Sequence, residues 1–594
     1  MQCVCTLDTP GERPLYLPGW LDTTAKRTYF LVLCVFVVLV ALQIELSTWL
    51  IRGSGASIAL KLVLAATACT GIVGAGQAAQ FLVFAAIAIA RRGRPFSTFP
   101  PHFSDADLPP LFVQIPGRNE PLELVRHSIE SVRALNYPTG KIFIQHIDNS
   151  DDARYERVAS LYVSDKRVSV VHRDGVRGFK AGNLNIGMAH APEGLLLAKN
   201  ALIVILNVGD TLARESLRLM ASEFVRDASV GFVQSVMVVE NPDESIITRV
   251  ESYIANAMNR FLYGCQNAYG IPMTSGSAVA LRAQALLQVG GWDEQTLGED
   301  WATAMRIAMK GWRPMWVDYA PTDPRVVCGE AAPYSLEGQQ KQKNRWATAS
   351  SQLLRLYFLE WMRSDLPWNQ KVDITLRSLT FPTASLRYVG MLLFPLWLTI
   401  PAVARFGYQI AHFPLQLALL SASLQNAFLL FVLSIAAIYV MERRPKDAFW
   451  LSVSIPVQLL YHLPIVPHIA RGVARGARRV SSVFVVTPKA AESHGLRGFL
   501  AKQRLAFLTL AWLLIPSAIV LLIRPAGYAR FLSILLGLAA SMLLGIFLVP
   551  LWAWLTRVAA FLRFAPAPSA AAEGVRSHDQ PAGEAPQDHL ARPR

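Results

Sequence analysis

Acidic and amide side chains follow two apolar runs of this chain, where they could bind a metal ion and a diphosphate. The run IFIQHI ends in Asp148 and Asn149, and the run ALIVIL ends in the residues NVGD, from Asn207 to Asp210. Magnesium typically takes one or two carboxylates together with phosphate oxygens. Asp and Asn are also ordinary turn residues, but their recurrence after successive runs favours a site for a divalent cation and a nucleotide diphosphate.

Two further motifs carry groups that suit phosphate contacts and proton transfer. Residues 179–185 (FKAGNLN) offer the Lys180 cation and the Asn183 amide in a tight backbone, although Gly-Asn is also common in turns. Glu299 and Asp300 precede a helical stretch, where carboxylates commonly cap the start of the helix. A carboxylate at this point could instead take a proton from an acceptor hydroxyl.

Residues 342–346 (QKNRW) combine three groups that suit a nucleotide sugar and its acceptor. Gln342 offers an amide, and Arg345 offers a forked donor for phosphate. Trp346 offers a flat face on which a sugar ring could stack. An interfacial Trp/Arg anchor is the alternative interpretation.

The segments around these motifs are expected to build one open α/β sheet. Five short runs have the length and β-branched content of buried strands, and residues 122–135 have helical periodicity. Ligands of such a sheet bind at the C-terminal ends of its strands, where the polar residues gather. The runs are LFVQIP (111–116), IFIQHID (142–148), VSVVHR (168–173), ALIVILN (201–207) and VGFVQSVMVV (230–239).

The composition of the whole chain excludes a plain soluble enzyme. Its 594 residues are 53% hydrophobic and only 17% charged, against about 25% charged in an average globular chain. Lys and Arg number 57 against 42 Asp and Glu, for a net charge of +15, and the arginines crowd at the ends of apolar runs, as cytoplasmic flanks of membrane spans do. We therefore expect no nucleic-acid partner. The 6 cysteines are scattered without paired C-x-x-C units, which indicates neither a zinc site nor a disulfide scaffold.

Apolar runs long enough to cross a bilayer lie before and after the polar middle of the chain. Arg91, Arg92 and Arg94 place the end of the second run in the cytoplasm by the positive-inside rule. We expect two spans before the middle and four after it. The runs are 28–50, 62–90, 388–404, 415–441, 505–523 and 531–555.

Two other apolar segments are not expected to cross. Residues 449–470 have basic clusters on both sides and hold three prolines, so we place them in the membrane interface. Residues 352–371 mix aromatic and charged side chains, which is typical of an amphipathic surface helix. Thr487 and Lys489, in FVVTPK, lie on a cytoplasmic loop only if residues 449–470 stay in the interface.

Taken in order, these motifs resemble those of the processive, membrane-embedded family 2 glycosyltransferases of the cellulose synthase and curdlan synthase type. That series is an aspartate after an early strand, a KAGNLN-like segment, D-x-D, T-E-D, Q-x-x-R-W and F-x-V-T-x-K in a gating loop. The resemblance covers roughly residues 28–555, and two positions depart from it: NVGD lacks one carboxylate of D-x-D, and GED replaces T-E-D. The matching residues are Asp148, 180–185, 207–210, 298–300, 342–346 and 484–489.

The resemblance implies a GT-A-type, Rossmann-like α/β glycosyltransferase domain inserted in an all-α transmembrane bundle. It implies that Asp300, beside Glu299, deprotonates the acceptor, and that Trp346 stacks on the terminal sugar of the growing chain. It also implies that Asp210 and Asn207 hold Mg²⁺ or Mn²⁺. The residues that it places around the nucleotide sugar are Asp148, Asn149, Lys180, Asn183, Asp210, Gln342, Arg345, Thr487 and Lys489.

The apolar runs, the composition and the resemblance together divide the chain into nine parts. They are a cytoplasmic N-terminus (1–27), two transmembrane helices (28–94), a cytoplasmic glycosyltransferase domain (95–350), amphipathic interfacial helices (351–380), two transmembrane helices (381–441), an interfacial segment (442–480), a gating loop (481–500), two transmembrane helices (501–556) and a disordered tail (557–594).

We therefore expect an inverting, processive enzyme of the bacterial inner membrane that polymerises a β-glucan, or a related β-glycan, from UDP-glucose and exports it. Its partners are then the UDP-sugar donor, the growing polysaccharide and the lipid bilayer, and a periplasmic export subunit could receive the product. Two alternatives stay open: a single-transfer enzyme acting on a lipid acceptor, and a catalytically weakened binding or secretion subunit, which the altered D-x-D position suggests. No residue separates the linkage types.

Overall fold

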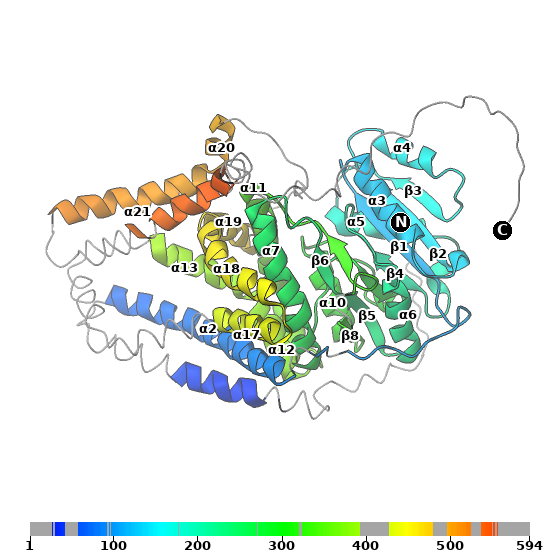
Figure 1. Ribbon diagram of the computed structural model, residues 1–594, viewed down its shortest axis with the longest axis horizontal. Coiled ribbons are helices and arrows are strands. Elements are labelled where there is room, and N and C mark those ends of the chain that lie inside the picture. Colours follow the sequence, from blue (N-terminus) through cyan, green and yellow to red (C-terminus); the bar gives the residue numbers. More distant parts are fainter. Residues whose placement is uncertain are drawn as a thin grey trace, which may run out of the picture. The chain divides into compact units, whose positions relative to one another are not determined.

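The computed structural model places nine strands and a series of helices in the part of the chain that it describes (Figure 1). It describes residues 27, 30–41, 58–91, 94–95, 97–175, 177–269, 271–319, 323–392, 427–478, 496–523, 536–537, 539–548, 550–552 and 555. Nearly all of them belong to one compact unit, residues 1–549; of the second unit, residues 550–594, the structure describes four helical residues.

Seven strands form one mixed sheet in the order β3-β2-β1-β4-β7-β5-β8, in which β7 is antiparallel to its neighbours and the other pairs are parallel. A second, two-stranded parallel sheet joins β6 and β9. The strands are β1 (Leu111–Gly117), β2 (Ile142–Asp148), β3 (Val168–His172), β4 (Leu202–Ile205), β5 (Val230–Ser235), β6 (Met237–Val239), β7 (Val279–Arg282), β8 (Arg313–Val317) and β9 (Cys328–Glu330).

The helices continue through the whole described part of the chain. They are α2 (Ile58–Ala90), α3 (Leu122–Arg133), α4 (Arg154–Leu161), α5 (Phe179–Ala189), α6 (Ser216–Arg226), α7 (Ile246–Ala257), α8 (Tyr263–Tyr269), α9 (Ala283–Gln288), α10 (Glu299–Met309), α11 (Leu336–Arg363), α12 (Trp368–Ser378), α13 (Thr380–Leu392), α17 (Ala427–Met441), α18 (Pro445–His462), α19 (Val466–Ala477), α20 (Leu496–Lys502) and α21 (Arg504–Ile523), with short 3₁₀ turns at Thr139–Lys141 and Leu195–Leu197 and a π-helical turn at Met258–Leu262.

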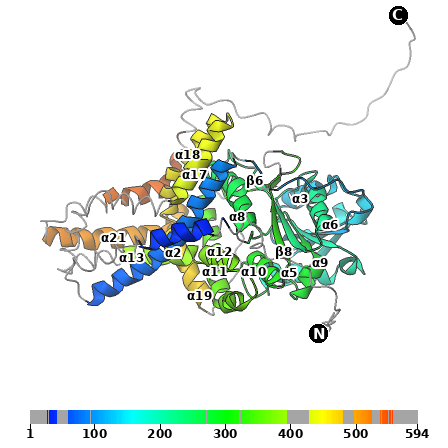
Figure 2. The same ribbon diagram turned by 90° about the horizontal axis from the view of Figure 1, so that it is seen from below.

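Apart from its edge strand β3, the large sheet is buried on both faces, which explains why its strands read as nearly continuous apolar runs. Alternate side chains of β1 illustrate this: Leu111, Val113 and Ile115 pack in a core with α3 and α6, whereas Phe112 packs in a core with α5, α9, α10 and α11. Figure 2 shows α3 and α6 on one side of the sheet and α5, α9 and α10 on the other. The sheet is therefore covered by helices on both faces, as an α/β core requires.

The sheet confirms the α/β expectation but differs from it in detail. The run 230–239 was expected to be one strand, yet it forms β5 in the large sheet and β6 in the small one. β7, β8 and β9 were not expected at all. These strands are short and are held by pairing with distant segments, and hydrophobic periodicity carries no record of such pairing.

The polar segment after the sheet also differs from its expected form. Residues 352–371 are not one surface helix, because α11 ends at Arg363 and α12 begins after Pro367. The break lies at Pro367 because a proline disfavours helical backbone in the residue before it. Tyr357 and Trp361 are buried in the core rather than turned outward. The expected domain boundary at residue 350 falls inside α11.

The expected membrane segments are described in part. Among the described residues, the stretch 71–90 of α2 is long and apolar enough to cross a membrane by itself, with a mean hydropathy of 1.9 over its most apolar window. α18 and α19 meet the same criterion only as a pair bent by 65°, at a point where Pro464 and Pro467 remove backbone donors. Shorter apolar helices cover 30–41, 431–441, 504–519 and 539–548, and the count of six spans stays a prediction.

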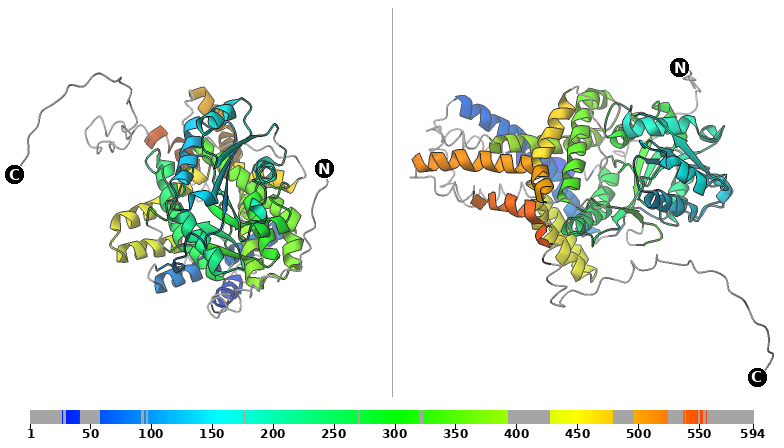
Figure 3. Two further views of the ribbon diagram at one scale, coloured as in Figure 1. Left: turned by 90° about the vertical axis from the view of Figure 1, so that its right-hand side faces the viewer. Right: turned by 90° about the horizontal axis from the view of Figure 1, so that it is seen from above.

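α19 packs directly on α11, and the two helices run side by side in the right-hand view of Figure 3. Two glycines on one face of α19 allow this approach. A Cβ atom at Gly472 would lie 2.4 Å from the carbonyl oxygen of Asn344, and one at Gly476 would lie 2.3 Å from that of Thr348. These two contact points, Asn344 and Thr348, lie just before and just after Arg345 and Trp346 in α11.

Candidate active site

A short loop before β7 brings together side chains from two helices of the core. Lys180, in the first turn of α5, donates to the carbonyl oxygen of Gly276 at 2.8 Å. Its Nζ also lies 3.2 Å from Oε1 of Glu299, the first residue of α10. Gly276 has a φ of +78°, and a Cβ atom there would lie 2.8 Å from Oδ2 of Asp300. Glycine is therefore required both by the backbone and by the approach of Asp300.

Asp300 is electrostatically poised to exchange a proton near neutral pH. Burial and the neighbouring Glu299 carboxylate raise its pKa to about 7, against the opposing charges of Lys180 and Arg345 and the backbone N–H of Trp301. That N–H donates to Asp300 Oδ1 at 2.8 Å. A carboxylate with this pKa can accept a proton at neutral pH and return it to solvent.

α11 carries Gln342, Arg345 and Trp346 past the start of α10. The loop that leads into α10 is tied to α11, because the backbone N–H of Leu297 donates to Gln352 Oε1 at 2.8 Å. Burial lowers the pKa of Arg345, and the carboxylates of Glu299 and Asp300 oppose that shift. The structure therefore brings Lys180, Glu299, Asp300 and Arg345 into one charged cluster of two cations and two acidic groups.

Trp346 directly follows Arg345 in α11, and its indole remains accessible. The residue is 42% exposed, and Lys343 places its Nζ 4.1 Å from the ring centroid. Gln342 is one helical turn away, a spacing that places the two on neighbouring parts of the α11 surface.

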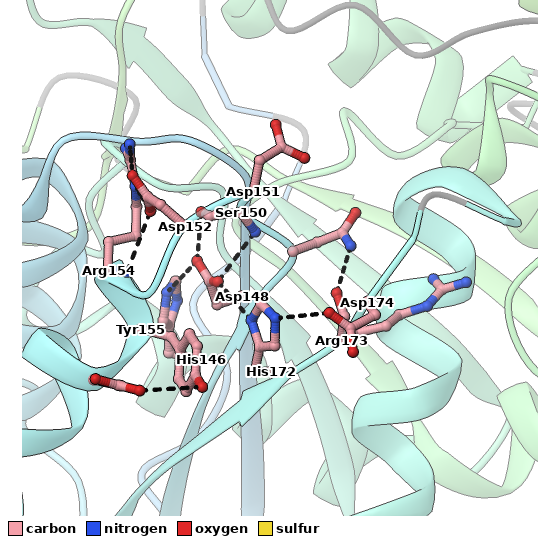
Figure 4. Close-up of polar contacts among 12 residues, drawn as sticks. His146, Asp148, Ser150, Asp151, Asp152, Arg154, Tyr155, His172, Arg173 and Asp174 are labelled. Atoms are coloured by element: carbon pink, nitrogen blue, oxygen red, sulfur yellow. Dashed lines mark hydrogen bonds and ion pairs between the residues drawn. The ribbon is translucent and has the colours of Figure 1, made fainter.

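A second polar cluster forms where β2 and β3 end (Figure 4). Asp148 is 2% exposed. Its carboxylate accepts bonds from the hydroxyl and backbone N–H of Ser150, at 2.7 and 3.0 Å, and lies 3.0 Å from Nδ1 of His172. Asn149 donates from its amide to the carbonyl oxygens of Arg173 and Gly175. The side chain of Asn149 thus holds the loop that follows β3.

Asn183 braces the same loop from α5. Its Oδ1 accepts a bond of 2.8 Å from Nη1 of Arg173, and the residue is 6% exposed. Lys180 and Asn183 are one helical turn apart, so α5 connects the charged cluster around Asp300 with the cluster around Asp148. The two asparagines expected at the nucleotide make their observed contacts with the protein backbone and with an arginine.

The residues expected to bind a metal stand at the two ends of one tight turn after β4. The N–H of Asp210 donates to the carbonyl oxygen of Asn207 at 3.1 Å, and Gly209 has a φ of +84°, as in a type II turn. The hydroxyl of Ser128 fixes this turn by donating to the Asp210 carbonyl and accepting from the Gly209 N–H. Ser277, in the loop before β7, accepts the N–H of Asn207 at 3.0 Å.

The donor chemistry of this turn fits an ion that is bound mainly through its substrate. Asp210 offers one carboxylate and Asn207 one amide oxygen. Among the described residues, no group of three or more His, Cys, Asp or Glu side chains is arranged to hold a metal ion. Mg²⁺ usually keeps several waters and binds through one or two carboxylates plus phosphates, so a diphosphate would have to complete the coordination.

Two predicted residues lie outside the described part of the chain, and three residues of the site were not predicted. Thr487 and Lys489 lie outside the described residues. Gly276, Ser277 and His172 were not singled out in the sequence. The only signal for the first two is a Gly between serines in TSGSA, directly before a strand, which is typical of a tight loop.

Two protein-family models match the part of the chain that carries these clusters. The model described as glycosyl transferase family 2 matches residues 112–290, and the model described as glycosyl transferase family group 2 matches residues 202–456. Among curated proteins, a probable glucomannan 4-beta-mannosyltransferase 4 from Oryza sativa subsp. japonica is 28% identical over 261 residues, which make up 42% of this chain. The match spans 45% of the rice protein, less than half of its length.

Solved structures with weak similarity include a mannosyltransferase and TarS. The mannosyltransferase PcManGT from Pyrobaculum calidifontis, in complex with GDP-Man and Mn²⁺, matches with a TM-score of 0.40 and 19% identity, over 66% of this chain and 98% of that one. S. aureus TarS 1–349 in complex with UDP-GlcNAc matches with a TM-score of 0.31 and 13% identity, over 58% and 91% of the two chains.

The two family matches overlap and together run through every described motif, from the Asp148 cluster to the Asp300 cluster and Trp346. The part of this chain that carries the α/β sheet, residues 112–456, is therefore similar to glycosyl transferase family 2.

Proposed function

We propose that this chain is an inverting, processive glycosyltransferase that polymerises a β-glucan, or a related β-glycan, from UDP-glucose. The observation that carries the proposal is the charged cluster at the start of α10. Asp300, with a pKa near 7, lies within the electrostatic reach of both Lys180 and Arg345. A proton acceptor beside two cations is what attack by a hydroxyl and departure of a diphosphate require.

The chemistry follows from this arrangement. Asp300 takes the proton of the acceptor hydroxyl while that oxygen bonds to the anomeric carbon of the donor sugar. The bond from that carbon to the diphosphate breaks on the opposite face, and the electron pair leaves with UDP. Lys180 and Arg345 offset the charge that builds on the leaving group. In-line displacement on an α-linked donor gives a β-linkage.

Asp210 and Asn207 would hold a Mg²⁺ or Mn²⁺ ion at the diphosphate. When bound, such an ion neutralises charge on the leaving phosphate. Thr487 and Lys489 would close over the bound nucleotide, as the family resemblance implies.

Export through the bacterial inner membrane belongs to the same proposal, with the catalytic domain in the cytoplasm. The apolar helix at residues 71–90 supports it, because Arg91 follows at once as a cytoplasmic flank. Trp346 supports processive transfer, since its exposed indole, on the residue after Arg345, offers the acceptor sugar a stacking surface. A periplasmic subunit could take up the emerging polymer.

The test is a panel of labelled nucleotide sugars offered to the purified full-length chain in lipid nanodiscs. We expect UDP-glucose to give UDP and an insoluble polymer in which NMR spectroscopy finds β-linked glucose. A chloroform-soluble product would show single transfer to a lipid instead. Nucleotide binding without turnover would indicate a weakened subunit, and polymer from GDP-mannose alone would refute the assigned donor.

The pKa of Asp300 predicts how turnover depends on pH. Protonated Asp300 cannot take the acceptor proton, so kcat is expected to fall about tenfold per pH unit below about pH 7. Lys180 holds this pKa down, so Lys180→Met should move the midpoint to higher pH, besides lowering the plateau. Initial rates of UDP release from about pH 5.5 to about pH 8.5 measure both effects. Glu123→Gln, at an exposed residue in α3, is the control that should leave the midpoint in place. A flat profile across this range would contradict the assignment of Asp300.

A further inference from the structure

His172 makes a contact with Asp148 that the family motifs do not include. The last residues of β2 and β3 are paired in the parallel register, Asp148 opposite His172. The Nδ1 atom of His172 lies 3.0 Å from Oδ2 of Asp148, whose side chain is 3% exposed. Ser150, the other donor to this carboxylate, is two residues away on the same loop. His172 is thus the described donor that ties Asp148 to a different strand (Figure 4).

The imidazole of His172 is held on three sides. Its Nε2 faces Oδ1 of the fully exposed Asp174 at 3.4 Å. The ring of Tyr155, in α4, stacks on it with the centroids 4.1 Å apart and the planes inclined by 19°. Only 21% of the His172 side chain is exposed. These contacts restrict the ring to one orientation, with Nδ1 directed at Asp148.

The other histidine near Asp148 cannot replace this donor. Nδ1 of His146 lies 2.9 Å from the carbonyl oxygen of Ile115, so in the neutral ring Nδ1 carries the hydrogen. Burial lowers the pKa of His146 and favours that neutral ring. Its Nε2 is 3.9 Å from Asp148 Oδ1, beyond hydrogen-bond distance. The imidazole that donates to Asp148 is therefore that of His172.

We propose that His172 is a positioning residue for donor binding: it fixes the rotation of the Asp148 carboxylate and so presents that group to the nucleotide in one geometry. This inference rests on the proposed function, in which Asp148 contacts the nucleotide. Groups that orient a binding residue act through that residue's geometry. The effect should fall on donor affinity rather than on turnover, because none of the described contacts of His172 involves Asp300 or Lys180.

The test compares two substitutions in the full-length chain. His172→Phe keeps a flat ring against Tyr155 but removes the donor, whereas His172→Asn keeps an N–H donor near the position of Nδ1. We expect His172→Phe to raise the Kd for UDP and the KM for the donor sugar about tenfold, with kcat within about twofold of wild type. His172→Asn should recover most of the affinity. His190→Phe, at an exposed histidine at the end of α5, should change neither constant.

The outcomes separate this inference from the proposed function. Wild-type affinity in His172→Phe would overturn the positioning role. A lowered Tm and weakened binding in both variants, with no recovery by Asn, would show a merely structural role and overturn it as well. If the wild-type chain binds UDP, and the two variants change the Kd as expected, but no sugar is transferred, the positioning role stands and the proposed function fails. If the wild-type chain binds no UDP, both fail.

Discussion

The variant Asp300→Asn is expected to release almost no UDP, with kcat lowered by about 10²- to 10⁴-fold. Asn has nearly the same shape, and its carbonyl oxygen can still accept the 2.8 Å bond from the Trp301 N–H. It cannot accept a proton, so the acceptor hydroxyl attacks without a base. Donor binding should persist, because Lys180 and Arg345 keep their charges. Coupled measurement of UDP release, together with UDP titration by calorimetry, separates the two quantities.

Glu299→Gln is the matched comparison for this result, because it neutralises the adjacent carboxylate and leaves the base. The Glu299 charge raises the pKa of Asp300, so its removal should shift the acid limb of the pH profile to lower pH while turnover continues. Wild-type turnover in Asp300→Asn would remove Asp300 from the mechanism. A loss in Glu299→Gln as severe as that in Asp300→Asn would transfer the role of base to Glu299.

The variant Trp346→Ala is expected to bind nucleotide normally and to fail in elongation. The indole is 42% exposed, on the residue that follows Arg345 in α11. Burial of one sugar face against it is worth about 1–3 kcal/mol, or about 5- to 150-fold in acceptor affinity. A processive enzyme depends on this affinity at every cycle, so chain length should fall more steeply than the rate of the first transfer. Size-exclusion analysis of labelled polymer measures the chain length.

Trp368 provides a closely matched control for Trp346. It is 62% exposed at the start of α12, and Lys371 lies 5.2 Å from its ring centroid, much as Lys343 lies over Trp346. Trp368→Ala should therefore leave polymer length unchanged. Equal chain lengths from Trp346→Ala and the wild type would exclude the stacking role.

Local patterns in the sequence were sufficient to predict the strands that lead to the first polar motifs, and the helix α3 between two of them. The runs at 111–116, 142–148 and 201–207 are buried on both faces, and a strand of that kind leaves a continuous apolar signal in the sequence. Residues 122–135 contain α3 because their apolar side chains recur with helical spacing. The polar residues that follow β2 and β4 could be located for the same reason, since strand ends are marked where the apolar run stops.

The tertiary structure alone decided which of those polar residues meet. Lys180 and Glu299 are far apart in the sequence, and their contact depends on Gly276 at the entry to β7, a strand that no local pattern indicated. Asn149 and Asn183 were expected at the nucleotide, and in the structure both contact Arg173 and fasten the loop after β3. His172 reaches Asp148 only because β2 and β3 pair in one particular register. Residue types and local spacing determine the elements and the chemical groups available, whereas strand pairing and helix packing between distant segments set the distances on which catalysis depends.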